Sequence, residues 1–184
     1  MDGDITLQQR YEAVGRRIET ACRAAGRPPD QVTLLAVSKT FPAGRVLDLA
    51  GCGQRRFGEN YLQEALAKIS ECAIQRPDWR LEWHFIGPIQ SNKTRPIAEH
   101  FDWVHSVDRE RVARRLAEQR PPHLAPLQVC IQVNIDGGAN KSGVIPPDAL
   151  ALAQAIAALP RLDLRGLMCI PEPCADYAST LAVH

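Results

Sequence analysis

Residues 127–135 read Leu-Gln-Val-Cys-Ile-Gln-Val-Asn-Ile, and this stretch decides how the predicted sheet closes. Its odd-numbered positions are all apolar, whereas Gln128, Gln132 and Asn134 lie between them. A central strand of an open doubly wound sheet has helices on both faces and should not carry three amides on one of them. A barrel strand has one helix-covered face and one interior face, which can be polar near a binding site. The stretch therefore favours a (β/α)8 barrel of TIM type over an open sheet.

Strand and helix patterns alternate on both sides of this stretch. Strands are predicted over 32–38, 55–59, 81–86, 103–107, 127–135 and 162–168. Helices are predicted over 6–25, 42–52, 61–73, 109–119 and 147–158, with others after Ser91 and near Ala175. Thr6 and Gln9 have the spacing of a capping box at the first helix. Regular βα units of this size predict a parallel α/β sheet, with about six units in a single domain over 1–184.

Composition excludes several classes of function. The chain has 184 residues, 45% hydrophobic and 23% charged, with a formal net charge of +1, which does not suggest a nucleic-acid partner. The arginines of residues 109–115 have the spacing of a solvated helix face. No stretch is apolar enough to span a bilayer, and the acidic N-terminus does not resemble a signal peptide. Six scattered cysteines fit free thiols in a reducing cytoplasm better than disulfides or a zinc site.

Polar residues gather where the predicted strands end. Lys39 follows the first strand, Glu59 and Asn60 follow the second, His84 lies in the third, and Asn134 and Asp136 close the fifth. Barrels place their active sites at the carboxyl ends of their strands. We expect these side chains to lie close together at the carboxyl-terminal mouth of the barrel.

Lys39 ends an apolar run and has two interpretations. It could cap a strand and extend into solvent. Alternatively, it could be a buried amine that reacts with a carbonyl, because desolvation disfavours the ammonium and frees the lone pair needed for a Schiff base. The residues around Lys39 do not by themselves decide between these interpretations.

Five segments of the chain, in order, resemble one protein family. They are LLAVSKTFP (34–42), RRFGENYLQEA (55–65), EWHFIGPIQSNK (82–93), GANKSG (138–143) and RGLMCIP (165–171). Together they are similar to the YggS/PROSC family of pyridoxal phosphate homeostasis proteins. The similarity extends from about residue 7 to the end of the chain.

The resemblance implies a fold type III barrel like the N-terminal domain of alanine racemase, holding pyridoxal 5′-phosphate (PLP). Lys39 matches the lysine that forms the covalent aldimine. Asn60 matches a residue beside the cofactor, and His84 and Met168 match positions that line the same mouth. The family resemblance implies a monomer, with PLP-dependent apo-enzymes as possible recipients of the cofactor.

Two further motifs have structural interpretations. The GGANKSG stretch (137–143) resembles a phosphate loop, but Val144 and Ile145 follow it rather than Lys-Ser, so it is not a Walker loop. Lys141 could attract an anion, although a solvated loop lysine is the more ordinary interpretation. Residues 87–90 (GPIQ) with Ser91 predict a turn and a helix N-cap.

Six strands are visible, whereas a closed barrel needs eight. In the family that the chain resembles, the segments after strands seven and eight hold the cofactor phosphate, and neither is present. About 500 Å² of uncovered apolar surface would cost about 12 kcal/mol, comparable with the whole stability of a domain. We therefore expect a C-terminally truncated chain that is unstable alone or self-associates to cover its edges.

Three functions remain open at this point. The first is a PLP carrier without substrate turnover, located in the cytoplasm and independent of nucleic acid, membranes and metals. The second is a fold type III amino-acid racemase or decarboxylase, which would require an additional C-terminal β-domain. The third is a truncated remnant or interaction module that binds no cofactor.

Overall fold

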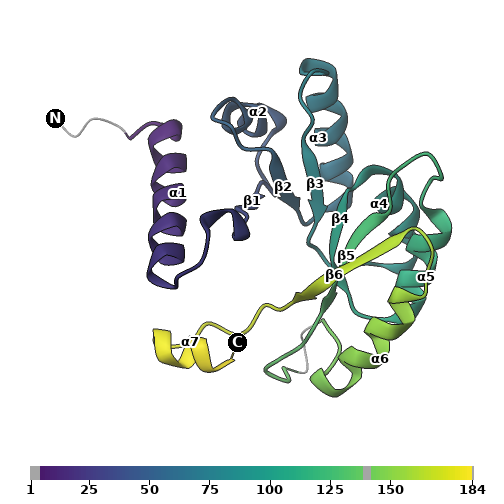
Figure 1. Cartoon of the computed structure of the whole chain (residues 1–184). Coiled ribbons are helices and arrows are strands. Elements are labelled where there is room, and N and C mark those ends of the chain that lie inside the picture. The colour runs from purple at the N-terminus through teal and green to yellow at the C-terminus, as the bar shows by residue number, and fades with distance from the viewer. Residues whose placement is uncertain (1–4, 139–141, 184) are drawn as a thin grey trace. The chain divides into compact units, whose positions relative to one another are not determined.

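The computed structural model describes residues 5–138 and 142–183 as parallel strands joined by helices (Figure 1). The strands are β1 (Ala36–Val37), β2 (Arg56–Glu59), β3 (Glu82–Phe85), β4 (Trp103–Val107), β5 (Leu127–Gln132) and β6 (Leu162–Met168). The helices are α1 (Leu7–Ala24), α2 (Ala43–Gly51), α3 (Leu62–Gln75), α4 (Thr94–His100), α5 (Glu110–Gln119), α6 (Pro146–Ala157) and α7 (Tyr177–Val183). Two 3₁₀ turns, η1 (Pro29–Gln31) and η2 (Ser91–Lys93), complete the elements.

The sheet has six strands in the order β1-β2-β3-β4-β5-β6, which is their order in the chain. A doubly wound sheet reverses its strand order at a switch point, whereas a barrel adds each strand beside the previous one. The topology therefore confirms the predicted α/β fold of consecutive βα units.

The chain divides into two compact units. Unit 1 comprises Met1–Glu59 and Gln63–Glu82, and unit 2 comprises Asn60–Leu62 and Trp83–His184. In unit 1, Thr6 and Gln9 form the predicted capping box: each side chain accepts a hydrogen bond from the backbone N–H of the other.

Strand β1 is much shorter than predicted. The apolar run suggested a buried strand over 32–38, but only Ala36 and Val37 are in the strand. Val32, the first residue of the run, is the C-cap of η1 and donates its N–H to the carbonyl of Pro29, and residues 33–35 are not in a strand. Val37 is 47% exposed, since β1 is the first strand of the sheet and pairs with β2 alone.

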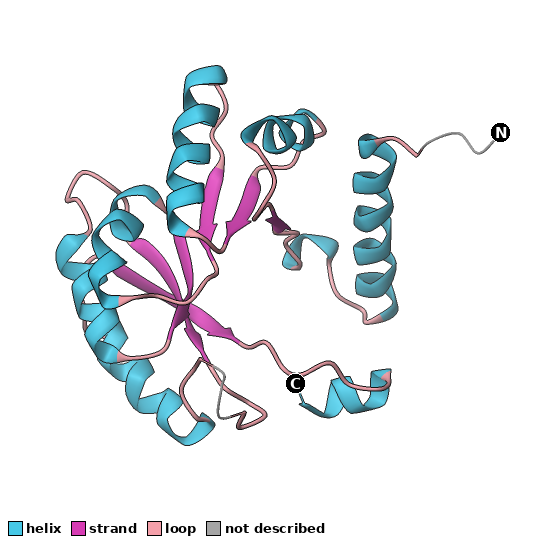
Figure 2. Ribbon diagram, turned by 180° about the vertical axis from the view of Figure 1, so that it is seen from behind, coloured by secondary structure: helices cyan, strands magenta, loops and turns pink. Residues whose placement is uncertain are grey.

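In unit 2, α4, α5 and α6 cover one face of the strands (Figure 2). On this face Leu127, Val129 and Ile131 are completely buried, whereas Gln128 and Gln132 alternate with them, point to the opposite face and are half-buried. The alternation that favoured the barrel is therefore confirmed, although β5 ends at Gln132 rather than at residue 135.

A buried arginine, Arg120, joins the end of α4 to the loop after α5 in unit 2. Nothing in the sequence pattern indicates this role. The Arg120 guanidinium donates to the carbonyl oxygens of Ala98, Phe101 and Ala125. Ala98 and Phe101 lie at and just after the C-terminal end of α4, where backbone carbonyls lack helical partners, and Ala125 lies in the loop between α5 and β5. Burial lowers the pKa of Arg120 from its ordinary value.

Two other sequence predictions concern helices of unit 2. Arg109, Arg111 and Arg114 are exposed, as the solvated-face interpretation requires, whereas Arg115 is half-buried and donates to Thr94 Oγ1. The prediction that Ser91 is an N-cap is wrong: Ser91 begins η2, and α4 starts after Lys93 without a side-chain cap. The 3₁₀ turn replaces the cap, because Lys93 N–H donates to the carbonyl of Gln90.

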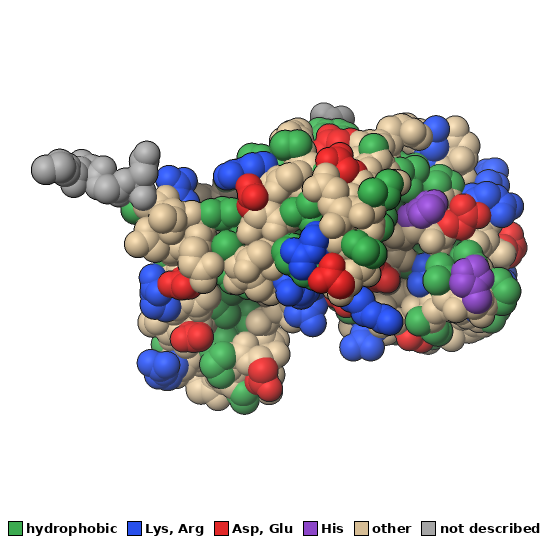
Figure 3. Space-filling model, turned by 90° about the horizontal axis from the view of Figure 1, so that it is seen from above, with side chains coloured by type: hydrophobic (Ala, Val, Ile, Leu, Met, Phe, Trp, Pro, Cys, Tyr) green, Lys and Arg blue, Asp and Glu red, His purple; other side chains and the backbone are tan. Residues whose placement is uncertain are grey.

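Charged side chains of both signs lie interspersed on the face drawn in Figure 3, as expected for a net charge of +1. Among the described residues, no helix combines the length and the apolar character needed to cross a membrane.

Candidate functional site

Lys39 lies in a tight turn at the carboxyl end of β1, in unit 1. The turn is closed by a hydrogen bond of 3.1 Å from Phe41 N–H to the carbonyl of Ser38, so Lys39 is its second residue. The Lys39 side chain is exposed. Within the described part of the chain it makes no hydrogen bond or ion pair. Of the two interpretations of Lys39, the structure therefore fits the side chain that extends into solvent and not the buried amine, because β1 ends two residues earlier and leaves the turn at the surface.

The residue after Lys39 has an unusual backbone conformation. Thr40 has φ of 67°, and only one other described non-glycine residue, Arg161, has positive φ. The third position of a type II turn requires positive φ and favours Gly or Asn. A β-branched residue in this conformation is strained, at a cost of about 1–3 kcal/mol.

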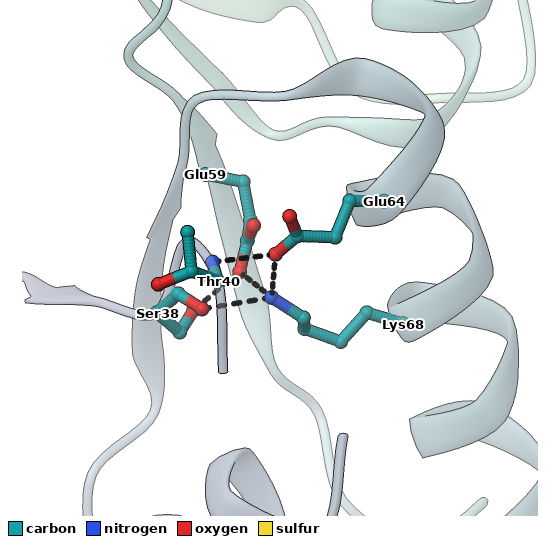
Figure 4. A network of polar contacts seen from close by, with 5 residues as sticks. All are labelled: Ser38, Thr40, Glu59, Glu64 and Lys68. Atoms are coloured by element: carbon teal, nitrogen blue, oxygen red, sulfur yellow. Dashed lines mark hydrogen bonds and ion pairs between the residues drawn. The ribbon is translucent and has the colours of Figure 1, made fainter. Parts of the chain in front are cut away.

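A buried charged network lies against this turn (Figure 4). At its centre, Lys68 Nζ from α3 is 2.6 Å from Glu59 Oε1 and 2.9 Å from Glu64 Oε1. Lys68 also donates to the carbonyl of Ser38 at 2.8 Å. Ser38 Oγ donates to Glu59 Oε1 at 2.6 Å, and Thr40 N–H donates to Glu64 Oε1 at 2.6 Å.

The network is buried from solvent at its centre. The Lys68 and Glu59 side chains are 3% and 0% exposed, and that of Glu64 is 35% exposed. The hydrogen bond that Glu64 accepts from Lys68 holds the pKa of Glu64 below the ordinary value. Removing one partner of such a buried pair costs about 3–5 kcal/mol, since it leaves the other charge unpaired.

Of this network, the pattern of strand ends in the sequence indicates Glu59 but not Ser38, Glu64 or Lys68. One signal for Lys68 is present in the sequence. The buried face of α3 carries Ala65, Lys68 and Cys72, so a lysine occupies an apolar position of the helical repeat. A lysine on an apolar stripe needs a buried anionic partner, which the sequence alone does not identify.

His84 lies on the face of unit 2 opposite the helices and is engaged by its neighbours. Its ring is stacked on that of Trp103, with centroids 5.4 Å apart, and its Nδ1 is 2.8 Å from His105 Nε2. His84 is only 5% exposed. Burial, and secondarily the neighbouring His84, lower the pKa of His105 to about 4.

Met168 reaches the same face through an irregularity in β6. Gln128 pairs with Asp163 and Val129 with Leu164, but the register then shifts and Cys130 pairs with Gly166. As a result Met168 pairs with Gln132, and paired residues of neighbouring strands point to the same face. Without this shift, side chains that alternate along β6 from Leu162, which pairs with Leu127, would place Met168 on the helix-covered face.

Asn60 lines a hollow of about 220 Å³ in unit 2. The other lining residues are Ile86, Pro88, Gln132, Val133, Asn134, Ser142 and Ile170. The backbone of Asn60 approaches Gly87 so closely that a Cβ at residue 87 would overlap the Asn60 carbonyl. Asn134 Nδ2 donates to the carbonyl of Gly138, and its buried Oδ1 has no hydrogen-bond partner in the described chain. Of the predicted site residues in unit 2, Asn60 and Asn134 thus share one hollow.

The glycine-rich stretch has a structural role at its end. Gly143 has φ of 122°, and a Cβ there would contact the backbone of Val133 and Asn134. The loop returns to β5 at this point, with Asn134 N–H donating to the carbonyl of Val144. Lys141 lies outside the described residues. The carboxylate of Asp136 accepts the N–H of Glu172, and the described residues contain no metal-binding cluster of His, Cys, Asp and Glu.

Known proteins similar to this chain agree on one family. The model of the alanine racemase N-terminal domain matches residues 10–181. Pyridoxal phosphate homeostasis protein of Pseudomonas aeruginosa is 60% identical over 174 residues, which are 95% of this chain and 74% of that protein. The corresponding protein of Vibrio cholerae is 54% identical, over 96% of this chain and 75% of the relative.

Solved structures of PipY from Synechococcus elongatus are similar to this chain as well. The structure without PLP has a TM-score of 0.75 and 37% identity, over 90% of this chain and 76% of PipY. The structure with PLP bound has a TM-score of 0.73 and 35% identity, over the same shares of the two chains. The chain therefore belongs to the YggS/PROSC family of pyridoxal phosphate homeostasis proteins, which has the fold of the alanine racemase N-terminal domain.

Proposed function

We propose that this protein binds PLP as a Schiff base on Lys39 and serves PLP homeostasis in the cytoplasm without substrate turnover. The observation that carries the proposal is the presentation of Lys39: an exposed amine on a turn whose two flanks are bonded to a buried network. The PLP-bound structure of a 35% identical relative supports the same ligand class. Six free cysteines support a reducing compartment.

The described residues fit a cofactor that carries an aldehyde. Bound PLP would supply that aldehyde. Lys39 would supply the amine that condenses with the aldehyde carbon, with the carbonyl oxygen and two amine protons leaving as water. The family resemblance makes Asn60, His84 and Met168 candidate cofactor-binding residues, and in this proposal apo-enzymes that depend on PLP receive the cofactor.

The test uses PLP, borohydride and peptide mapping. The chain contains only four lysines, Lys39, Lys68, Lys93 and Lys141, so a reduced pyridoxyl group can be assigned to one of them by mass spectrometry. We expect label on Lys39 and a visible absorption band that survives dialysis. Lys39→Ala should lose both, and Lys93→Ala serves as the matched control. Equal bands in wild type and Lys39→Ala would refute the assignment.

The same sample tests the absence of turnover. Incubation of the PLP-loaded protein with L-alanine and other amino acids should give neither the D-enantiomer nor a released amine. Racemisation or decarboxylation above the rate of free PLP would instead favour an enzyme of the same fold.

A further inference from the structure

The turn that carries Lys39 is held on both flanks by α3 and β2. The hydroxyl of Ser38, before Lys39, donates a hydrogen bond to Glu59. The carbonyl oxygen of Ser38 accepts a hydrogen bond from the ammonium of Lys68. Thr40, after Lys39, donates its N–H to Glu64. Two hydrogen bonds, of 2.6 and 2.8 Å, therefore hold the backbone on either side of Lys39, and a third, of 2.6 Å, holds the Ser38 side chain. The Lys39 side chain itself stays exposed.

The conformation that these bonds hold is a costly one. Thr40 has a positive φ at a turn position that favours glycine, and Thr40 is exposed. Burial of the threonine side chain therefore does not explain its conformation. Strained residues persist where surrounding contacts over-determine them, and they cluster at functional sites.

The source of the restraint is buried. Lys68 and Glu59 are almost inaccessible to solvent, and Lys68 bonds Glu59, Glu64 and Ser38 with its ammonium. One side chain of α3 thus ties the end of β1 to the end of β2. A rigid helix is a more precise support for a reactive side chain than a loop.

We propose that the Glu59–Lys68–Glu64 network positions Lys39, through the strained turn of residues 38–41, for its reaction with PLP. This inference rests on the function proposed above and adds positioning residues to it. Glu59, Glu64 and Lys68 act through the backbone of the turn and not by contact with the cofactor.

The test compares rates of lysine labelling. Glu64→Ala removes the acceptor of Thr40 N–H, Glu64→Gln keeps an acceptor there, and Glu71→Ala is the matched control. Glu71 lies on the same helix, is exposed, and its carboxylate accepts a hydrogen bond from the side chain of Gln75. Each protein is mixed with PLP, quenched with borohydride at successive times, and mapped for pyridoxyl groups on Lys39 and Lys93. Thermal unfolding of each protein without PLP is recorded in parallel.

Glu64→Ala should slow labelling of Lys39 on the order of tenfold and leave Lys93 unchanged, because a misplaced reacting group loses rate steeply. Glu64→Gln should recover most of the rate, and Glu71→Ala should match wild type. Thr40→Gly keeps the N–H but relaxes the turn, so it should also slow the labelling of Lys39. This second variant tests the inference even if Glu64→Ala unfolds. Wild-type rates in both Glu64→Ala and Thr40→Gly would overturn the inference alone. Absence of Lys39 labelling in wild type would overturn the proposed function, and this inference with it.

Discussion

At the scale of single residues, Thr40 stores strain that a glycine would release. The cost of its positive φ is about 1–3 kcal/mol, and glycine adds about 0.5–1 kcal/mol of chain entropy to unfolding. Thr40→Gly should therefore raise the free energy of unfolding by about 1 kcal/mol, measured by urea denaturation.

Thr40→Ala is the control for this prediction. Alanine removes the same branched side chain but keeps a Cβ, so it keeps most of the strain. If both variants change stability equally, the positive φ of Thr40 is not a source of strain.

His105 makes stability depend on pH in mildly acidic solution. Its folded pKa of about 4 lies below the ordinary value of 6.5. Between these values the unfolded chain binds a proton that the folded chain does not, so the free energy of unfolding falls as pH decreases from 6.5 to 4. Because His105 is only half-buried, we expect a loss of about 2 kcal/mol rather than the full value for such a shift.

Denaturation at a series of pH values checks the effect of His105. The variant His105→Gln should lose this part of the pH dependence and keep the part below pH 4.5, to which Glu64 contributes. The pKa of Glu64 is lowered in the folded state, so its contribution is present above the ordinary value and is lost as pH falls through the folded pKa. Identical pH profiles for His105→Gln and wild type would contradict the assignment to His105.

At the scale of elements, the connection after β3 depends on a glycine. In Gly87→Ala the new Cβ would overlap the carbonyl of Asn60, so the backbone must move and the hollow beside Asn60 must change. We expect a loss of about 1–3 kcal/mol of stability, measured by thermal or urea unfolding.

Gly44→Ala is a matched substitution with the opposite expected sign. Gly44 is the second residue of α2, and a Cβ there meets no atom within 4 Å. Alanine should stabilise this helix by about 0.5–1 kcal/mol. A neutral Gly87→Ala would show that Asn60 and Gly87 are not in close contact.

At the scale of the whole molecule, the strands at the two ends of the sheet order carry exposed apolar side chains. Val37 of β1 is 47% exposed and Leu167 of β6 is 68% exposed. Exposed edge strands promote association, and a charged side chain on the edge opposes it. We expect the isolated chain to self-associate with increasing concentration in size-exclusion chromatography with light scattering, and Leu167→Lys to shift it towards the monomer.

Leu150→Lys is the control, because Leu150 is 69% exposed but lies on α6 rather than on an edge strand. A wild-type chain that stays monomeric and melts cooperatively at every concentration would contradict the prediction.

That the chain is a single PLP-binding domain of an incomplete barrel stays a prediction of the sequence.

Local pattern in the sequence was enough to determine the order and type of nearly all elements, the capping box at Thr6 and the alternation of β5. These features depend on residues close together in the chain, whose periodicity and capping chemistry are visible in the sequence. The family resemblance added Lys39 and Asn60 as candidate site residues. None of this required knowledge of which distant residues meet.

Only the tertiary structure decided how those residues are held. Lys68 meets Glu59 and Ser38 across 9 and 30 residues of sequence, and a shift in register brings Met168 level with Gln132. The turn at Thr40 likewise depends on its contact with Glu64 of α3. The physical reason is that buried charges and strand register are set by partners distant in sequence, which local propensity does not specify.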